Sequence, residues 1–183
     1  MKNNLNLILL AVLTMVLFAS ACGDKNAAEA NKFVESANKK TQEAKEMVDK
    51  MPKNIGQWID DTKDIAESQK AHEAEAKETL KKWDKIIETE KSAAGDFREA
   101  VKLNSDQTYK NYYEALAKQM DIQVEKGNTN KSVFQSFLDS SDWDAFGEKA
   151  GSFKAKMQDL QKQDADNAAQ ITKLETSLPN AKK

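Results

Sequence analysis

The sequence predicts an all-α protein, an elongated antiparallel helical bundle with coiled-coil-like packing. Apolar residues recur at alternating spacings of three and four along almost the whole chain after residue 30, which is the period of packed amphipathic helices. The 183 residues include only two Pro and six Gly, and 32% are charged, as is typical of long solvated helices. No strand-like alternation with a period of two is visible beside these patterns.

The first helical pattern runs from Ala30 to Met51, and Pro52 ends it because proline cannot continue a helix. Asn54 can cap the next helix, which we predict over residues 55–102 because its apolar stripe never changes phase.

The long second pattern continues across Gly95. A glycine inside a helix costs about 1 kcal/mol relative to alanine, so residues 92–96 are a possible kink. Several seam positions of the predicted bundle are Ala, Thr, Gln or charged, with Glu90 and Asp164 among them. The bundle ends should therefore be slim and only modestly stable.

A third helix is predicted to begin after a cap at Ser105 or Asp106 and to end at Gly127, because glycine commonly follows a helix terminus. Residues 128–131 are polar and predict a loop. The apolar residues that follow predict a brief helix over 133–138.

The last predicted helix is capped by Ser140 or Ser141 and carries an apolar stripe from Trp143 to Leu178. Pro179 ends it. We therefore expect the bundle over residues 30–178 and a polar tail over 179–183.

The amino-terminal segment has the plan of an export signal: a polar start with Lys2, an apolar run over residues 5–18, and then Ala19-Ser20-Ala21-Cys22. The apolar core is shorter than the roughly 20 residues that a spanning helix needs. Small residues followed by Cys resemble the lipobox of bacterial lipoproteins, although Ala19 stands where Leu is commonest.

This resemblance implies that residues 1–21 are removed by cleavage after Ala21, that Cys22 carries the acyl chains, palmitate among them, and that residues 22–29 form a lipidated tether. It also implies a membrane partner through those acyl chains and a place in the bacterial cell envelope. Gly23 follows Cys22 where an inner-membrane lipoprotein has Asp, which favours the outer membrane facing the periplasm in a host with two membranes. The alternative is an ordinary signal peptide, which would leave Cys22 as a lone thiol.

Most aromatic residues fall between Phe97 and Phe153, and this clustering predicts one thick apolar head over residues 97–153. Adjacent helical residues point about 100 degrees apart, so Tyr112 and Tyr113 cannot both face one narrow seam. Core packing is the first interpretation of this group. A groove for a ligand or peptide is the alternative, with these candidate interaction residues: Tyr109, Tyr112, Tyr113 and Trp143.

His72 is the only histidine, and Glu75 lies one turn further on, so the pair could bind a transition metal weakly. A helical di-iron site needs two Glu-x-x-His pairs, and here the residue three before His72 is Gln69. A solvated or seam-edge histidine is the simpler interpretation.

Specific chemistry is not visible elsewhere. The sequence offers no catalytic triad, phosphate-binding loop or metal-ligand spacing, so we expect no enzyme activity and no cofactor. Its 28 basic residues are matched by 30 acidic residues and interleaved with them, which disfavours nucleic-acid binding. The sequence therefore predicts a lipid-anchored envelope protein with a structural or protein-interaction role. A binding groove in the aromatic head is the second hypothesis, and a periplasmic metal-handling protein is the third.

Overall fold

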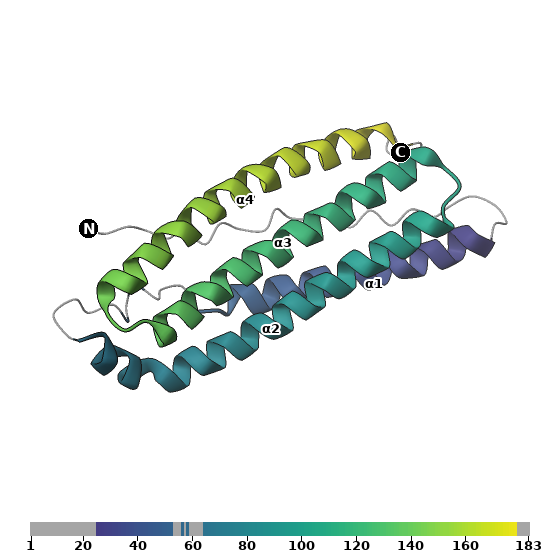
Figure 1. Cartoon of the computed structure of the whole chain (residues 1–183). Coiled ribbons are helices and arrows are strands. Elements are labelled where there is room, and N and C mark those ends of the chain that lie inside the picture. The colour runs from purple at the N-terminus through teal and green to yellow at the C-terminus, as the bar shows by residue number, and fades with distance from the viewer. Residues whose placement is uncertain (1–24, 53–55, 57, 59–63, 179–183) are drawn as a thin grey trace.

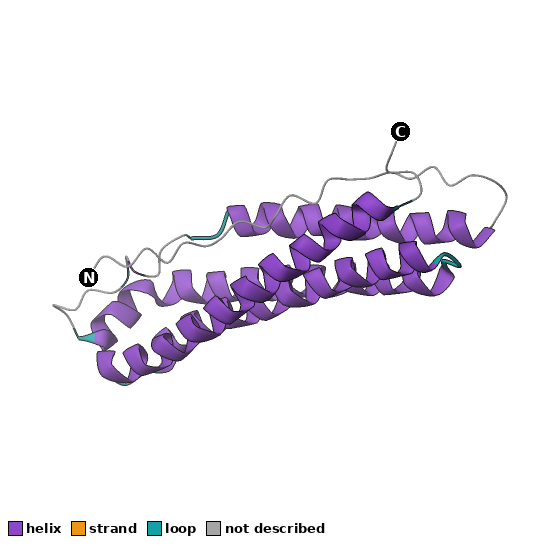
Figure 2. Ribbon diagram, turned by 90° about the horizontal axis from the view of Figure 1, so that it is seen from above, coloured by secondary structure: helices purple, strands orange, loops and turns teal. Residues whose placement is uncertain are grey.

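The computed structural model describes residues 25–52, 56, 58 and 64–178, and it confirms the all-α prediction. The described chain is an up-and-down bundle in which each helix runs antiparallel to the one before it (Figure 1). Its helices are α1 (Lys25–Asp49), α2 (Ile65–Leu103), α3 (Gln107–Asp139) and α4 (Trp143–Ser177). A view turned by 90° shows the same long, narrow arrangement (Figure 2).

Helix α1 packs against α2 through small side chains. Ala30, Ala37 and Ala44 recur every seven residues and are almost fully buried, which keeps one narrow stripe of α1 on its neighbour. Thr41 lies on the same stripe, and its hydroxyl donates to the Ala37 carbonyl oxygen at 2.9 Å. The helix begins at Lys25, so its first residues fall in the segment expected to be a tether.

Helix α2 begins at Ile65, ten residues later than predicted. The Asp64 carboxylate accepts a hydrogen bond from the Ala66 amide at 3.2 Å and thus caps the helix. Asn54, the predicted cap, lies outside the described residues. The predicted apolar stripe extends upstream of residue 65 because Trp58 is in phase with it. In the structure Trp58 is buried as that phase predicts, but it lies in a turn and not in a helix.

Helix α3 is one continuous helix, so the predicted stop at Gly127 and the predicted loop over 128–131 are wrong. A Cβ atom on Gly127 would lie 2.9 Å from Cγ1 of Ile87, so this glycine allows α2 and α3 to approach closely. The polar residues that follow are accommodated within the helix. Thr129 and Ser132 donate to the backbone carbonyl oxygens four residues earlier, at 2.8 and 2.9 Å.

The connection from α3 to α4 is short, and Asp142 caps α4 instead of Ser140 or Ser141. The Asp142 carboxylate accepts a hydrogen bond from the Ala145 amide at 2.7 Å. Ser140 is engaged with the end of α3, because its hydroxyl donates to the Ser136 carbonyl oxygen at 2.7 Å. Pro179 and the predicted polar tail lie outside the described residues.

The core divides into two apolar clusters. One contains Phe97, Tyr112 and Tyr113, and the other contains Phe134 and Phe137. Because α3 is continuous, Tyr113 and Phe134 lie about 30 Å apart along its axis. The single aromatic head predicted over residues 97–153 is therefore wrong.

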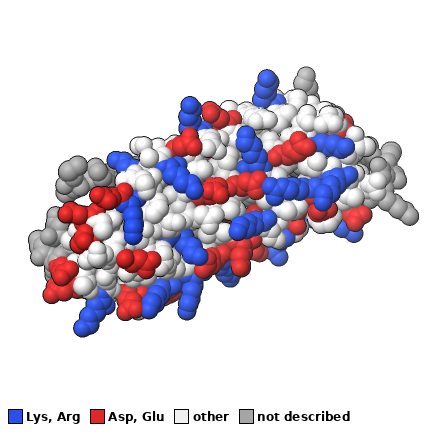
Figure 3. Space-filling view, in the orientation of Figure 1, with Lys and Arg blue, Asp and Glu red and all other residues white. Residues whose placement is uncertain are grey.

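Helix α3 occupies the centre of the bundle, because α2 and α4 both pack on it. Sixteen of its 33 residues are buried, compared with five of 35 in α4. Lysines and acids interleave over the face drawn in Figure 3. None of the helices within the described ranges is long and apolar enough to cross a membrane.

Candidate functional site

A layer of polar side chains crosses the interior of the bundle, and we call it the buried polar layer. Each of its members is at most 8% exposed. It consists of Glu90 on α2, Gln119, Gln123 and Lys126 on α3, and Asp164 and Asn167 on α4.

Asp164 is the centre of this layer. Its carboxylate accepts hydrogen bonds from Gln119, from Gln123 at 2.8 Å and from Lys126 at 2.5 Å. Three donors from α3 thus converge on one acid from α4. A buried carboxylate with these partners is satisfied, whereas the same carboxylate alone would be expensive to bury.

Asn167 adds a second connection between α3 and α4. Its amide nitrogen donates to the Ala115 carbonyl oxygen at 3.0 Å and to the Gln119 side-chain oxygen at 2.8 Å. Gln119 consequently links Asn167 to Asp164. The oxygen of the Asn167 side chain is buried and has no hydrogen-bond partner in the described structure.

Glu90 brings α2 into the layer without a matched partner. Burial raises the pKa of this carboxyl to about 8, and the nearby positive charge of Lys126 opposes the rise only in part. Glu90 is therefore mainly protonated at neutral pH. One of its oxygens is buried and makes no hydrogen bond in the described structure.

The layer is suited to positioning helices more than to chemistry. Lys126 and Asp164 are held by one another deep in the bundle. A buried ion pair adds little net stability, but it can specify the register of packed helices. The layer therefore fixes how α4 sits along α3.

Sequence reasoning found two members of the layer and missed four. Glu90 and Asp164 stand in the predicted apolar stripes as charged seam residues, and that was the usable signal. The apolar spacing after Asp164 favours Ala168 as the next seam residue, whereas the structure buries Asn167. Gln119, Gln123 and Lys126 were missed because α3 is buried around most of its circumference, so its polar residues do not stand out from a single stripe.

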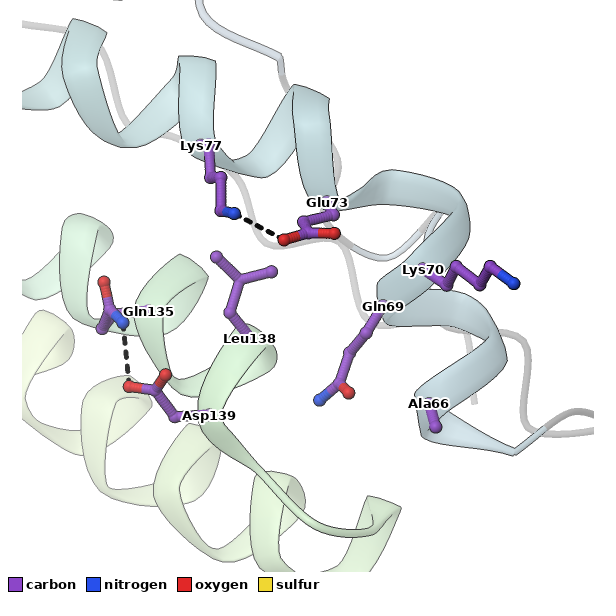
Figure 4. Close-up of a pocket in the computed structure, with 8 residues that line it drawn as sticks. All are labelled: Ala66, Gln69, Lys70, Glu73, Lys77, Gln135, Leu138 and Asp139. Carbon is purple, nitrogen blue, oxygen red and sulfur yellow. Dashed lines mark hydrogen bonds and ion pairs between the residues drawn. The ribbon is translucent and has the colours of Figure 1, made fainter.

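A concave region lies at the surface between the start of α2 and the end of α3 (Figure 4). It has a volume of about 430 Å³ and is lined by both polar and apolar groups. Glu73 accepts from Lys77 at 2.5 Å, and Gln135 donates to Asp139 at 2.9 Å, so these groups are paired within their own helices. Gln69 donates to the Phe137 and Ser140 carbonyl oxygens at 2.7 and 2.8 Å and thereby closes the end of α3.

His72 packs on an aromatic ring. Its ring lies 5.3 Å from that of Trp58, with an angle of 12° between the two planes. Its Nδ1 atom is 3.7 Å from a Glu75 oxygen. The described residues hold no group of three His, Cys, Asp or Glu side chains that could bind a metal ion, so the metal-handling hypothesis finds no ligand set there.

The predicted interaction residues are divided between the two ends of the bundle. Tyr112 and Tyr113 are buried, and the centres of their rings are 5.7 Å apart. The ring centre of Tyr109 lies 6.2 Å from that of Tyr113. Burial raises the pKa of Tyr113 to about 12 and that of Tyr112 further. Trp143 is half-buried at the other end, beside Phe137 and Phe146. The structure therefore brings the three tyrosines together but not Trp143 with them.

Comparison with known proteins gives a match to a family model. Residues 12–139 match the family model described as intraflagellar transport complex B protein 46 C terminal. No curated protein and no solved structure matches the chain. The matched segment covers α1, α2 and α3, ends where α3 ends, and leaves α4 outside.

This match corrects the functional predictions. The resemblance to a bacterial lipoprotein depended on residues 1–23 alone, whereas the family match extends over three bundle helices and starts inside the segment expected to be removed. The predicted membrane partner through acyl chains on Cys22 and the predicted envelope, outer-membrane and periplasmic location are therefore wrong. Ala21 and Cys22 themselves lie outside the described residues. A match over well more than half of the 183 residues means that the chain belongs to the family of intraflagellar transport complex B protein 46 C-terminal domains.

Proposed function

We propose that this chain is a non-catalytic helical component of intraflagellar transport complex B, and that its bundle provides surfaces on which other proteins of the complex assemble. The observation that carries the proposal is the family match over residues 12–139. We therefore expect α1, α2 and α3 to form the part of the bundle responsible for assembly.

The described side chains support a role in assembly more than in catalysis. In the interior, Lys126 of α3 is paired with Asp164 of α4, and Gln119 of α3 with Asn167 of α4. Many charged residues of the surface are paired within one helix, as Lys82 is with Glu78 at 2.6 Å. Such exposed pairs contribute little to stability and keep a helical surface soluble.

The charge pattern favours proteins over nucleic acids as partners. The chain has 28 basic and 30 acidic residues, and both signs alternate over the face shown in Figure 3. Nucleic-acid binding proteins instead gather basic residues in a patch or stripe.

The test is recovery of the tagged full chain from ciliated cells. We expect it to co-purify with complex B and to enter cilia. Phe97 is fully buried, so Phe97→Asp should disrupt the core and abolish both results, whereas Asp166→Asn on the exposed face of α4 should change neither. A folded wild-type chain that never co-purifies with complex B would refute the proposal.

A further inference from the structure

An imidazole lies over a buried indole at the end of the bundle where α2 begins. His72 is the only histidine of the 183 residues, and its ring is stacked 5.3 Å from that of Trp58, with an angle of 12° between the planes. Trp58 is 4% exposed, whereas the His72 side chain is 32% exposed. The imidazole therefore packs on the indole and can still exchange a proton with water.

Trp58 joins the connection between α1 and α2 to the rest of the bundle. The centre of its ring lies 5.5 Å from that of Phe134 and 5.8 Å from that of Phe137, both on α3. The Phe137 ring in turn lies 6.0 Å from that of Phe146 on α4. A contact that holds Trp58 in place therefore also holds the α1–α2 connection against this end of the bundle.

The charged group that faces His72 comes from its own helix. A carboxylate oxygen of Glu75 lies 3.7 Å from Nδ1 of the imidazole. The α1–α2 connection presents Trp58, and α3 presents aromatic rings beyond it, none of which carries a charge. The other charged residues within one turn of His72 on α2, and those at the adjoining ends of α1 and α3, are exposed: Asp49, Lys50, Lys70, Glu73 and Asp139.

Protonation of His72 changes the nature of the stack. A cation over the face of tryptophan is attracted by the negative face of the ring system, and an imidazolium is also attracted to the Glu75 carboxylate. A neutral imidazole keeps only the stacking of the two rings. Histidine is the side chain that ordinarily changes its charge between about pH 5 and 8, so the contact is stronger on the acidic side of this range.

We propose that His72 and Trp58 form a pH-sensitive clasp, in which protonation of the imidazole tightens the hold of the α1–α2 connection on the bundle and loss of the proton loosens it. Glu75 strengthens the closed state by pairing with the imidazolium. The clasp goes beyond the proposed function and does not depend on it.

The clasp can be tested on the full chain by NMR, through exchange of the Trp58 indole hydrogen with water. The chain has three tryptophans, and the Trp58 signal is the one that disappears in Trp58→Phe. His72→Phe keeps a ring to stack on the indole but cannot carry a charge. At about pH 5.5 we expect the Trp58 hydrogen to exchange about two- to fivefold faster in His72→Phe than in the wild type, because the cation–π attraction is lost. At about pH 8 the two chains should exchange alike.

Three results would overturn the proposal. One is equal exchange in the two chains at about pH 5.5. Another is a difference of the same size at both pH values, which would be an effect of packing and not of charge. The third is a change of the same size in the Trp83 signal, because the whole chain would then be opening.

Two further variants complete the experiment. Glu75→Gln should show part of the same acceleration at about pH 5.5, whereas Glu73→Gln, whose carboxylate is paired with Lys77, should match the wild type. If His72→Phe does not fold, His72→Gln takes its place. Its exchange relative to the wild type should then be about two- to fivefold faster at the acidic pH than at the alkaline one, and an equal ratio at both would overturn the proposal. The assay does not involve complex B, so it can fail or succeed independently of the proposed function.

Discussion

Gly127 illustrates how a residue that usually ends a helix can be required in the middle of one. Its neighbours Lys126 and Thr129 are buried, and α3 continues through them to Asp139. The glycine leaves room for Ile87 of α2, which a Cβ atom would meet at 2.9 Å. Tertiary packing thus overrides the local preference that led the sequence to predict a helix end.

Gly127 and Gly151 should respond in opposite ways to replacement by alanine. Gly127→Ala gains up to about 1 kcal/mol of helix propensity but must displace Ile87, and overpacking costs about 1 to 3 kcal/mol. We expect a net loss of about 1 kcal/mol in the free energy of unfolding. Gly151→Ala has open space around it and should gain about 0.5 to 1 kcal/mol. Denaturant titration of both variants would measure this contrast, and a loss at Gly151 would contradict it.

The structure reverses the order of importance for core packing that the sequence suggested for Trp58 and Trp143. The sequence predicts that Trp143 is the more important anchor, because it stands beside other large apolar residues. In the structure Trp58 is only 4% exposed and packs on Phe134 and Phe137, whereas Trp143 is half-buried. The helical period places Trp58 on the apolar stripe but does not show that it packs on Phe134 and Phe137.

Trp58→Ala should therefore destabilise the chain more than Trp143→Ala. Truncating a buried tryptophan costs about 3 to 5 kcal/mol, and the half-exposed ring of Trp143 should cost less. Thermal unfolding followed by circular dichroism gives the comparison. A larger loss for Trp143→Ala would mean that the packing of Trp58 contributes little to stability.

The ends of the helices were harder to predict than their faces. The stripes placed Ala37, Trp83, Ile171 and many others on buried positions, because the hydrophobic period repeats over several turns. The position of a helix end, by contrast, depends on a single capping residue, which no repeated pattern marks. Between α3 and α4, three consecutive residues can all act as caps, and composition does not choose among Ser140, Ser141 and Asp142.

The choice of Asp142 can be measured. Asp142→Ala removes the acceptor for the Ala145 amide and should lower the free energy of unfolding by about 1 kcal/mol. Ser141→Ala removes only the hydroxyl that donates to the Asp142 carboxylate at 2.9 Å, leaves the cap acceptor in place, and should change it by less than about 0.5 kcal/mol. Equal losses from the two substitutions would show that both side chains share the cap.

Helices that are distant in sequence meet in the buried polar layer, and the contacts between them could not be predicted from the sequence. Glu90 and Asp164 could be placed on seams, but a seam position does not reveal which residue lies across from it. The three donors to Asp164 come from α3, whose rotation is set by packing against both α2 and α4. The members of the layer could therefore be identified only from the packed arrangement of all the helices that contribute to it.

Glu90 should make the stability of the bundle depend on pH. Its pKa is about 8 in the folded chain and about 4.5 ordinarily, so between these values the folded chain holds a proton that the unfolded chain has released. Stability from this group is complete below pH 4.5 and is lost as the pH rises towards 8, by up to about 1.4 kcal/mol for each pH unit. Above pH 8 no further loss is expected from Glu90.

Glu90→Gln should remove this dependence, because the amide does not ionise. Denaturant titrations at several pH values from 5 to about 8.5 would show a shallower decline for Glu90→Gln than for the wild type. Glu73→Gln on the exposed face is the control and should leave the decline unchanged. A wild-type decline that survives Glu90→Gln would assign it to another group.

The separation of the two apolar clusters also divides the chain's natural fluorophores. The sequence contains three tryptophans and three tyrosines. Trp58, Trp83 and Trp143 all belong to or pack on the cluster with Phe134, whereas every tyrosine belongs to or packs on the cluster with Phe97. Selective excitation of indole therefore reports on one end of the bundle, and phenol emission reports on the other. The unlabelled protein can show optically whether its two ends melt together or in turn.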